Sequence, residues 1–247
     1  MSTWTRCFHP VSRARARLVC FPHAGGSASA YHPLSAALAQ EGVEVRAVQY
    51  PGRQDRFREA RAERVDQVVD AVAAELRPVL ADGLPFGLFG HSMGAVLAFE
   101  TARRLEGDGR GPAVLFVSGR QAPSLPWPPP GGRRLGHADD AALVEEVRLL
   151  SGQQAEALNH PGLLRLTLPT LRADYRLLED YAYVPGPELD CPVVALAGDR
   201  DPRVAVDTVA RWERETRAGF AMRVLPGGHF FLDEHLPSVA ETVRSRL

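Results

Sequence analysis

Ser92 lies in a pentapeptide of the form G-x-S-x-G, Gly90-His91-Ser92-Met93-Gly94, which closes a short apolar run. A serine hydroxyl is a weak nucleophile until an adjacent base removes its proton. Where a strand turns sharply into a helix, the turn exposes the serine and brings neighbouring backbones so close that only glycine fits beside it. The pentapeptide therefore predicts a nucleophilic serine on a strand-to-helix turn, at the positive end of the helix dipole.

Two histidines stand late enough in the chain to be the base of this serine. In hydrolases with such a turn, the chain order is serine, then acid, then histidine. His229 lies in a Pro-Gly-Gly-His loop directly after the last expected strand, from which its side chain can reach across the site. His235 lies at an expected helix entry, which favours a solvated surface residue. We therefore predict His229 as the base and assign His23, which precedes the serine, a structural hydrogen-bonding role.

Two aspartates compete for the role of the acid that orients this histidine. Both lie in the segment 198–202 (GDRDP), after an expected strand. Residues 119–123, which follow the preceding strand, contain no carboxylate and are excluded. Asp201, three residues past the glycine, has the usual placement of a hydrolase acid, whereas Asp199 could cap the turn through its own backbone. We therefore predict Asp201 as the acid.

Acyl transfer through a serine also needs N–H donors for the oxygen that becomes negative. One donor should be the backbone N–H of Met93, the residue after the nucleophile. The other should come from the loop after the first central strand, residues 21–27 (FPHAGGS), where paired glycines let the backbone approach a substrate. We predict the N–H of Ala24 as this second donor, with Gly25 as the alternative.

These side chains require a scaffold that brings the ends of several strands together. Short apolar runs alternate with segments of helical spacing, and the runs at 85–90, 113–118 and 192–198 are nearly unbroken, as in strands buried on both faces. The alternation predicts an α/β protein with a mostly parallel sheet and helices on both faces. Further strands are expected at 17–22, 43–49 and 221–225, and helices at 32–40, 65–80, 92–105, 204–216 and 236–247.

One connection between strands is unusually long. Residues 122–190 separate two expected strands by about seventy residues, although a crossover needs only about a dozen. The connection opens with a Pro- and Gly-rich piece (SLPWPPPGG) and continues with helical spacing at 139–151 and 162–181. Such a connection is typical of a helical lid, with a small structural insertion as the alternative. We therefore expect a core formed by 1–121 and 191–247, and a lid formed by 122–190.

Composition and charge exclude several functional classes. The chain has 247 residues and a net charge of −1, which gives no strong field for a polyanion such as nucleic acid. No apolar run approaches the roughly 18 residues of a membrane span, and residues 1–10 lack the apolar core of a secretion signal. Three cysteines without metal-ligand spacing argue against a disulfide framework. We therefore expect a cytoplasmic protein. The Arg-rich stretch 53–64 also contains acidic residues, and we expect it to form a solvated helix face.

Several short motifs are characteristic in combination. They are FPHAGGSAS (21–29), YPGRQDR (50–56), GHSMGA (90–95), GDRDP (198–202) and PGGHFFL (226–232). Together they resemble the stand-alone, or type II, thioesterases that accompany modular polyketide and nonribosomal peptide synthases. The resemblance covers nearly the whole chain, including ADYRLLEDY (173–181) in the expected lid, and shows no departure at the predicted catalytic positions.

The resemblance implies an editing enzyme with an α/β-hydrolase fold and a mobile lid. Such enzymes hydrolyse stalled or incorrect acyl groups from the phosphopantetheine arm of acyl or peptidyl carrier proteins, through an acyl-serine. We expect carrier domains as partners, a monomer that meets neither nucleic acid nor membrane, and no metal or redox cofactor. Because carrier proteins are typically acidic, we expect a local docking patch among Arg120, Arg133 and Arg134, which flank the start of the expected lid, with merely solvated arginines as the alternative.

Two other functions remain open at this point. A small-molecule serine esterase of secondary metabolism would use the same three residues, and a strong preference for carrier-bound thioesters over simple oxygen esters would decide against it. A non-catalytic binding protein on a hydrolase scaffold is the second alternative, which the presence of Ser92, Asp201 and His229 disfavours.

Overall fold

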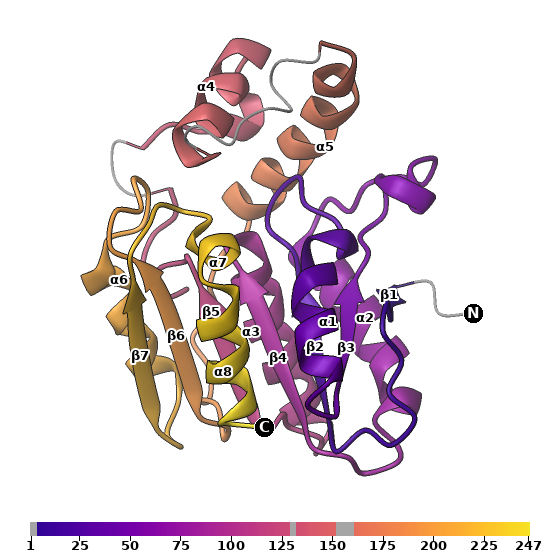
Figure 1. Cartoon of the computed structure of the whole chain (residues 1–247). Helices are drawn as coiled ribbons and strands as arrows, with labels where there is room; N and C mark the ends of the chain where they lie inside the picture. The colour runs from indigo at the N-terminus through magenta and orange to yellow at the C-terminus, as the bar shows by residue number, and fades with distance from the viewer. Residues whose placement is uncertain (1–3, 129–131, 152–160) are drawn as a thin grey trace.

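A parallel sheet forms the centre of the molecule (Figure 1). In the computed structural model, which describes residues 4–128, 132–151 and 161–247, seven strands follow the order β1-β3-β2-β4-β5-β6-β7. Every neighbouring pair is parallel except β1 with β3. The strands are β1 (Thr5–Arg6), β2 (Ala16–Phe21), β3 (Val43–Val48), β4 (Phe86–His91), β5 (Val114–Ser118), β6 (Val193–Gly198) and β7 (Phe220–Leu225). The predicted α/β class with a mostly parallel sheet is confirmed.

Helices cover both faces of this sheet. On one face α1 and α8 bury Leu38 and Val243 against the strands, and on the other face α2 and α3 bury Val72 and Leu97. The helices are α1 (His32–Ala39), α2 (Val65–Val79), α3 (Met93–Gly107), α4 (Asp140–Ser151), α5 (Pro161–Glu179), α6 (Val206–Ala210), α7 (Phe231–Glu234) and α8 (Leu236–Arg244). Two layers of helices around a parallel sheet satisfy the need of both sheet faces for apolar cover.

Burial along the strands explains their order in the sheet. Every residue of β4, β5 and β6 is buried, as their unbroken apolar runs require of central strands. At one edge of the sheet β7 exposes Arg223 and Val224. At the other edge the two residues of β1 pair with Val48 and Ala47 of β3. The serine turn therefore follows a strand in the interior of the sheet.

The connection between β5 and β6 leaves the sheet and returns to it. These two strands are neighbours, and α4 and α5 lie above the sheet edge to which the parallel strands point (Figure 1). The two helices build a small core of their own, in which Leu135, Leu143, Leu168 and Tyr175 are buried. Ala24, from the loop after β2, packs against this small core. The connection therefore covers the carboxyl ends of the strands, where the predicted site residues lie.

Most expected elements are present, with small differences at their ends. The helix expected at 204–216 is divided into α6 and a 3-10 turn at Arg211–Glu215. β1 and α7 have no signal in the sequence, because two and four residues are too few to show a period. Residues 129–131, part of the expected Pro- and Gly-rich piece, lie outside the described residues.

The stretch 53–64 differs from its prediction as a solvated helix face. It forms a 3-10 turn at Gln54–Arg56 and is otherwise irregular, and both Arg53 and Arg56 are buried. Arg53 pairs with Asp174, which is 121 residues away in the chain. The prediction is wrong because a local charge pattern does not reveal a partner that only the fold brings close.

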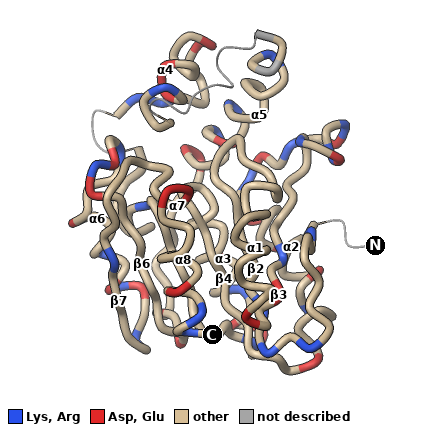
Figure 2. The backbone as a smooth tube through the Cα atoms, viewed as in Figure 1, with Lys and Arg blue, Asp and Glu red and all other residues tan. Residues whose placement is uncertain are grey.

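Neither positive nor negative charge dominates the described residues. Figure 2 shows basic and acidic residues interspersed over the backbone, in keeping with the net charge of −1. Within the described part of the chain, no helix has both the length and the apolar character needed to cross a bilayer.

Candidate active site

Ser92 occupies the sharp turn that the pentapeptide predicts. β4 ends at His91 and α3 begins at Met93, and Ser92 between them has φ 54° and ψ −115°, a conformation that few non-glycine residues adopt. A Cβ on Gly90 would lie 2.1 Å from the carbonyl oxygen of Gly94, and a Cβ on Gly94 would lie 1.9 Å from that of Phe21. Both glycines are therefore required by close backbone contacts.

Asp201 and His229 form a hydrogen-bonded pair at the ends of β6 and β7. The ring Nδ1 of His229 donates to Oδ2 of Asp201 over 2.7 Å, and the two side chains are 4% and 1% exposed. Oδ1 of Asp201 accepts the backbone N–H groups of Arg203 (2.9 Å) and Val204 (3.2 Å). These three bonds fix the carboxylate, and the proton on Nδ1 leaves Nε2 of His229 as the basic nitrogen.

The end of β5 brings the serine turn and the histidine together. The backbone N–H of Ser92 donates to the carbonyl oxygen of Ser118 over 2.8 Å. The next residue, Gly119, has φ 56°, and a Cβ there would lie 3.5 Å from Cε1 of His229. The ring of His229 therefore lies beside Gly119, the residue that directly follows Ser118, the hydrogen-bond partner of Ser92.

The loop that carries His229 is braced on both sides. Oδ1 of Asp199 accepts the N–H of Gly227 over 2.8 Å, and the N–H of Arg200 donates to the carbonyl oxygen of Gly227 over 2.9 Å. Nε2 of His235 donates to the carbonyl oxygen of Pro226 over 2.7 Å. Asp199 thus binds the opposite loop rather than its own turn, and His235 supports that loop from the start of α8.

The candidate oxyanion donors face different surroundings. The N–H of Met93 is at the first position of α3, where no carbonyl of the same helix can accept it. In the loop after β2 the N–H of Gly26 donates to the carbonyl oxygen of His23 over 2.9 Å. This bond closes a turn in which Gly25 has φ 75°. The N–H of Gly25, the alternative donor, is bound to Oδ2 of Asp174 over 2.7 Å. Ala24 lies in this turn between His23 and Gly25.

Two further histidines pack beside His229. Nδ1 of His91 lies 3.0 Å from Oγ of Ser118, and its ring centroid is 5.1 Å from that of His229. Burial, followed by the charges of the neighbouring His229 and His23, holds the pKa of His91 well below its usual value. Loss of solvent around its ring, followed by His229 and Arg53, lowers the pKa of His23 to about 4. Both rings are therefore neutral at pH 7.

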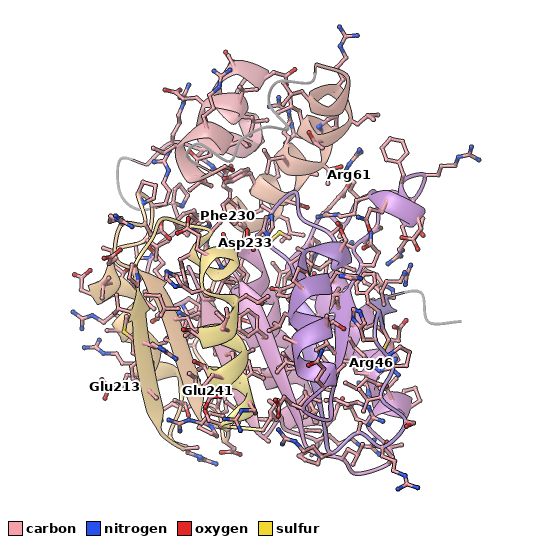
Figure 3. The ribbon with its side chains drawn as sticks, in the orientation of Figure 1. Arg46, Arg61, Glu213, Phe230, Asp233 and Glu241 are labelled. Carbon is pink, nitrogen blue, oxygen red and sulfur yellow. The ribbon has the colours of Figure 1, made fainter. Side chains whose placement is uncertain are left out.

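An apolar cavity of about 290 Å³ adjoins this group of rings. It is bordered by His23, His91 and Phe230, and lies between α1 and α8. Figure 3 shows Phe230 at the edge of the sheet that α4 and α5 cover. A larger groove of about 910 Å³ runs between α2, α3 and residues 180–190, on the other face and away from Asp201 and His229. Because the smaller cavity is lined by His23 and His91, we take it, rather than the larger groove, as part of the candidate site.

The sequence reasoning missed two residues that contact this region. Arg53 and Asp174 form a buried ion pair against the loop that contains Ala24. Arg53 lies in the motif YPGRQDR, and Asp174 lies in the motif ADYRLLEDY. These two motifs are the signal that could have identified the residues, whereas the local charge pattern could not.

The parallel sheet, the serine turn after β4 and the Asp–His pair after β6 and β7 define an α/β-hydrolase. A family model described as a thioesterase domain matches residues 16–247. The thioesterase PikA5 of Streptomyces venezuelae is 46% identical over 246 residues, which are 99% of this chain and 85% of that protein. A probable cadicidin biosynthesis thioesterase of Streptomyces griseus is 44% identical over 244 residues, which are 99% of this chain and 66% of that protein.

Solved structures agree with these sequence relatives. The type II thioesterase BorB from the borrelidin biosynthetic cluster has a TM-score of 0.87 at 42% identity, covering 99% of this chain and 98% of that one. RedJ, a thioesterase of the prodiginine pathway in Streptomyces coelicolor, has a TM-score of 0.86 at 38% identity, covering 95% and 86%. The chain belongs to the thioesterase family, which confirms the resemblance found in its motifs.

Proposed function

We propose that Ser92, His229 and Asp201 are the catalytic triad of a thioesterase that acts through an acyl-serine. The observation that carries this proposal is the 2.7 Å bond from His229 to Asp201, set beside the strained turn of Ser92. Asp201 keeps the proton of the ring on Nδ1, so that Nε2 can take the proton of Ser92. Burial of the pair keeps water from competing for the same hydrogen bond.

The reaction then has two halves. Oγ of Ser92 attacks the thioester carbonyl carbon while His229 takes its proton, and the negative oxygen binds the N–H groups of Ala24 and Met93. The thiol leaves with the proton of His229, and an acyl-serine remains. A water molecule, deprotonated by His229, attacks the acyl group and releases a carboxylic acid and free Ser92. The bond between Gly25 and Asp174 supports Ala24 as the donor, because it occupies the alternative N–H.

The proposed substrates are acyl groups on the phosphopantetheine arm of acyl or peptidyl carrier proteins, and the proposed role is removal of stalled or incorrect acyl groups. The similarity to a type II thioesterase of a biosynthetic cluster supports this role. We also assign residues 122–190 the role of a lid over the triad. Their helices lie above the carboxyl ends of the strands, where an arm must enter (Figure 1).

Hydrolysis of one acyl group in three forms tests the proposed function. We expect kcat/KM to be at least about tenfold higher for the carrier-bound thioester than for the N-acetylcysteamine thioester, a difference of about 1.4 kcal/mol in transition-state stabilisation. The ethyl ester of the same acyl group should be the poorest substrate. Equal or higher kcat/KM for the ethyl ester would instead identify a small-molecule esterase, and the panel is repeated with several carrier proteins to find the preferred one.

The arginines expected at a carrier-docking patch differ in their exposure. Arg120 is 3% exposed and stacks on the ring of Trp127 at 3.9 Å, so its inclusion in a surface patch is wrong. Arg133 and Arg134 are exposed; Arg133 pairs with Glu145, and Arg134 pairs with the exposed Asp180 and with the buried carboxylate of Glu179. The pairs with Glu145 and Asp180 are exposed and therefore weak, so an acidic partner can compete for both guanidinium groups.

Reversal of Arg133 and Arg134 to Glu should raise KM for an acyl-carrier protein, more strongly at low salt, because rim charges act on association and are screened by ions. KM for the N-acetylcysteamine thioester should not change. Steady-state kinetics at two ionic strengths measures both. The double reversal of Arg244 and Arg246, exposed residues at the opposite end of the sheet (Figure 1), is the matched control. An equal response of both substrates, or none, would remove these arginines from the docking surface.

A further inference from the structure

Three residues on one face of α5 hold the loops beside the candidate oxyanion donors. Thr170, Leu171 and Asp174 have the spacing of neighbours on a helix surface, and all three are at most 8% exposed. Oγ1 of Thr170 donates to the carbonyl oxygen of Gly52 over 3.2 Å. A Cβ on Gly25 would lie 3.2 Å from a methyl carbon of Leu171. The helix is therefore in direct contact with the loops after β2 and β3.

Asp174 is the most strongly bound of these residues. Its Oδ2 accepts the N–H of Gly25 over 2.7 Å and an N–H of Arg53 over 2.9 Å, and its Oδ1 accepts a second N–H of Arg53 over 2.7 Å. The Arg53 and Asp174 side chains are 8% and 5% exposed. The pair is bidentate and buried, the geometry in which an ion pair fixes orientation most firmly.

Arg53 completes a closed set of contacts around the turn that contains Ala24. Besides Asp174, its guanidinium donates to the carbonyl oxygen of Gly26 over 2.8 Å, and it stacks on the ring of Tyr50 at 4.8 Å. The hydroxyl of Tyr50 donates to the carbonyl oxygen of Pro22 over 3.1 Å. The turn is thus held at its beginning and its end from the loop after β3, and in its middle from α5.

These contacts bear directly on the direction of one N–H group. The carbonyl oxygen of His23, which shares a peptide plane with the N–H of Ala24, accepts the N–H of Gly26 over 2.9 Å, and the N–H of Gly25 in the next peptide plane binds Asp174. The peptide planes on either side of Ala24 therefore have little freedom. An oxyanion donor is useful only when it points at the developing charge before the reaction, so its fixed orientation has a direct kinetic value.

We propose that Asp174 and Arg53 are positioning residues for the oxyanion hole, and that the hole is complete only when α5 is seated on the core. This inference rests on the proposed function of Ser92 and Ala24. The carboxylate on α5 binds the N–H of Gly25 and holds the turn in its productive form. Arg53 neutralises that carboxylate and ties it to the core, so the position of the lid and the competence of the site are coupled.

A comparison of Asp174→Asn with Thr170→Val tests this inference. Asp174→Asn leaves one acceptor oxygen where the carboxylate has two, so its amide cannot accept the N–H of Gly25 together with both N–H groups of Arg53, and its NH₂ group meets another donor. Thr170→Val removes the contact of Thr170 with Gly52, so only the first change disturbs the turn at Ala24. Removal of one oxyanion donor costs about 10²–10³ in kcat, so misdirection of the donor in Asp174→Asn should lower kcat by at least about tenfold. KM for an N-acetylcysteamine thioester should stay within about twofold, and Thr170→Val should keep kcat within about twofold of the wild type.

A transition-state analogue separates positioning from simple loss of structure. We use the trifluoromethyl ketone that matches the acyl group, because its adduct with a serine carries a negative oxygen in the oxyanion hole. Its inhibition constant should rise in Asp174→Asn by the same factor by which kcat/KM falls. Thermal unfolding fixes the folded fraction of each variant. If Asp174→Asn does not fold, Arg53→Lys, which keeps the charge but loses the bidentate geometry, takes its place.

Each outcome has one meaning. A folded Asp174→Asn or Arg53→Lys enzyme with wild-type kcat, or with an unchanged inhibition constant, overturns the positioning role. If the Ser92→Ala variant retains activity, and if a fluorophosphonate does not label Ser92 in the wild-type enzyme, the proposed function itself fails. Labelling of Ser92 together with normal kinetics of Asp174→Asn leaves the proposed function standing and refutes this inference alone.

Discussion

Replacement of Ser92 by Ala should abolish turnover while the protein stays folded. Loss of the nucleophile of a Ser-His-Asp triad lowers kcat by about a millionfold, because no other group can form the acyl intermediate. The hydroxyl is small, and the turn around it is fixed by the contacts of Gly90 and Gly94 rather than by the serine side chain. Single-turnover hydrolysis of a carrier-bound thioester, with thermal unfolding as a check on folding, measures the effect.

The serine variant has a matched control on the next strand. Ser118→Ala removes a buried hydroxyl that contacts His91 but does not belong to the proposed triad. It should keep most of the activity. If folded Ser92→Ala hydrolysed the thioester at a rate near that of Ser118→Ala, Ser92 could not be the nucleophile.

Asp201→Asn should lower kcat by about ten-thousandfold, as the same change does in a comparable triad. The structure explains the sign of this effect. Two backbone N–H groups, of Arg203 and Val204, bind Oδ1 of Asp201 and will hold the amide oxygen of an Asn in that place. The amide NH₂ then points at Nδ1 of His229, which must become an acceptor. The ring proton moves to Nε2, and the ring can no longer take a proton from Ser92.

Asp199→Asn is the control for this change. An amide oxygen at position 199 can still accept the N–H of Gly227, so the brace of the histidine loop is kept. We expect kcat within about tenfold of the wild type, a small loss beside that of a triad residue. Rates at saturating thioester compare the two variants. A larger loss for Asp199→Asn than for Asp201→Asn would reverse the assignment of the acid.

The sheet could be predicted from the sequence because its central strands are apolar throughout. β4, β5 and β6 can be recognised from their own residues, without knowledge of what they pack against. The chain order of Ser92, Asp201 and His229 is the order of β4, β6 and β7, which they follow. Short elements were not predictable: β1 takes its place from pairing with β3 and from the bond of Thr5 with Glu75 on α2, and α7 has four residues.

Buried charge was the other limit of the sequence analysis. Arg53 and Arg120 look like exposed arginines in the sequence, yet both are buried. Arg53 is held there by Asp174, and Arg120 by the ring of Trp127. Asp174 comes from a distant segment, and Trp127, although it is near Arg120 in the chain, contacts it only through the fold of that stretch. A guanidinium that the sequence places on the surface is therefore found inside only when the fold is known.

The two edges of the sheet have a consequence for self-association. An open strand edge can pair with the same edge of a second molecule, which leads to aggregation. At one edge β1 offers two residues, too few to template a new strand. At the other edge β7 contains the charged Arg223, which donates to the carbonyl oxygen of Ser238 and to the hydroxyl of Thr242 on α8. Extension of the sheet from one molecule to the next is therefore disfavoured on both sides.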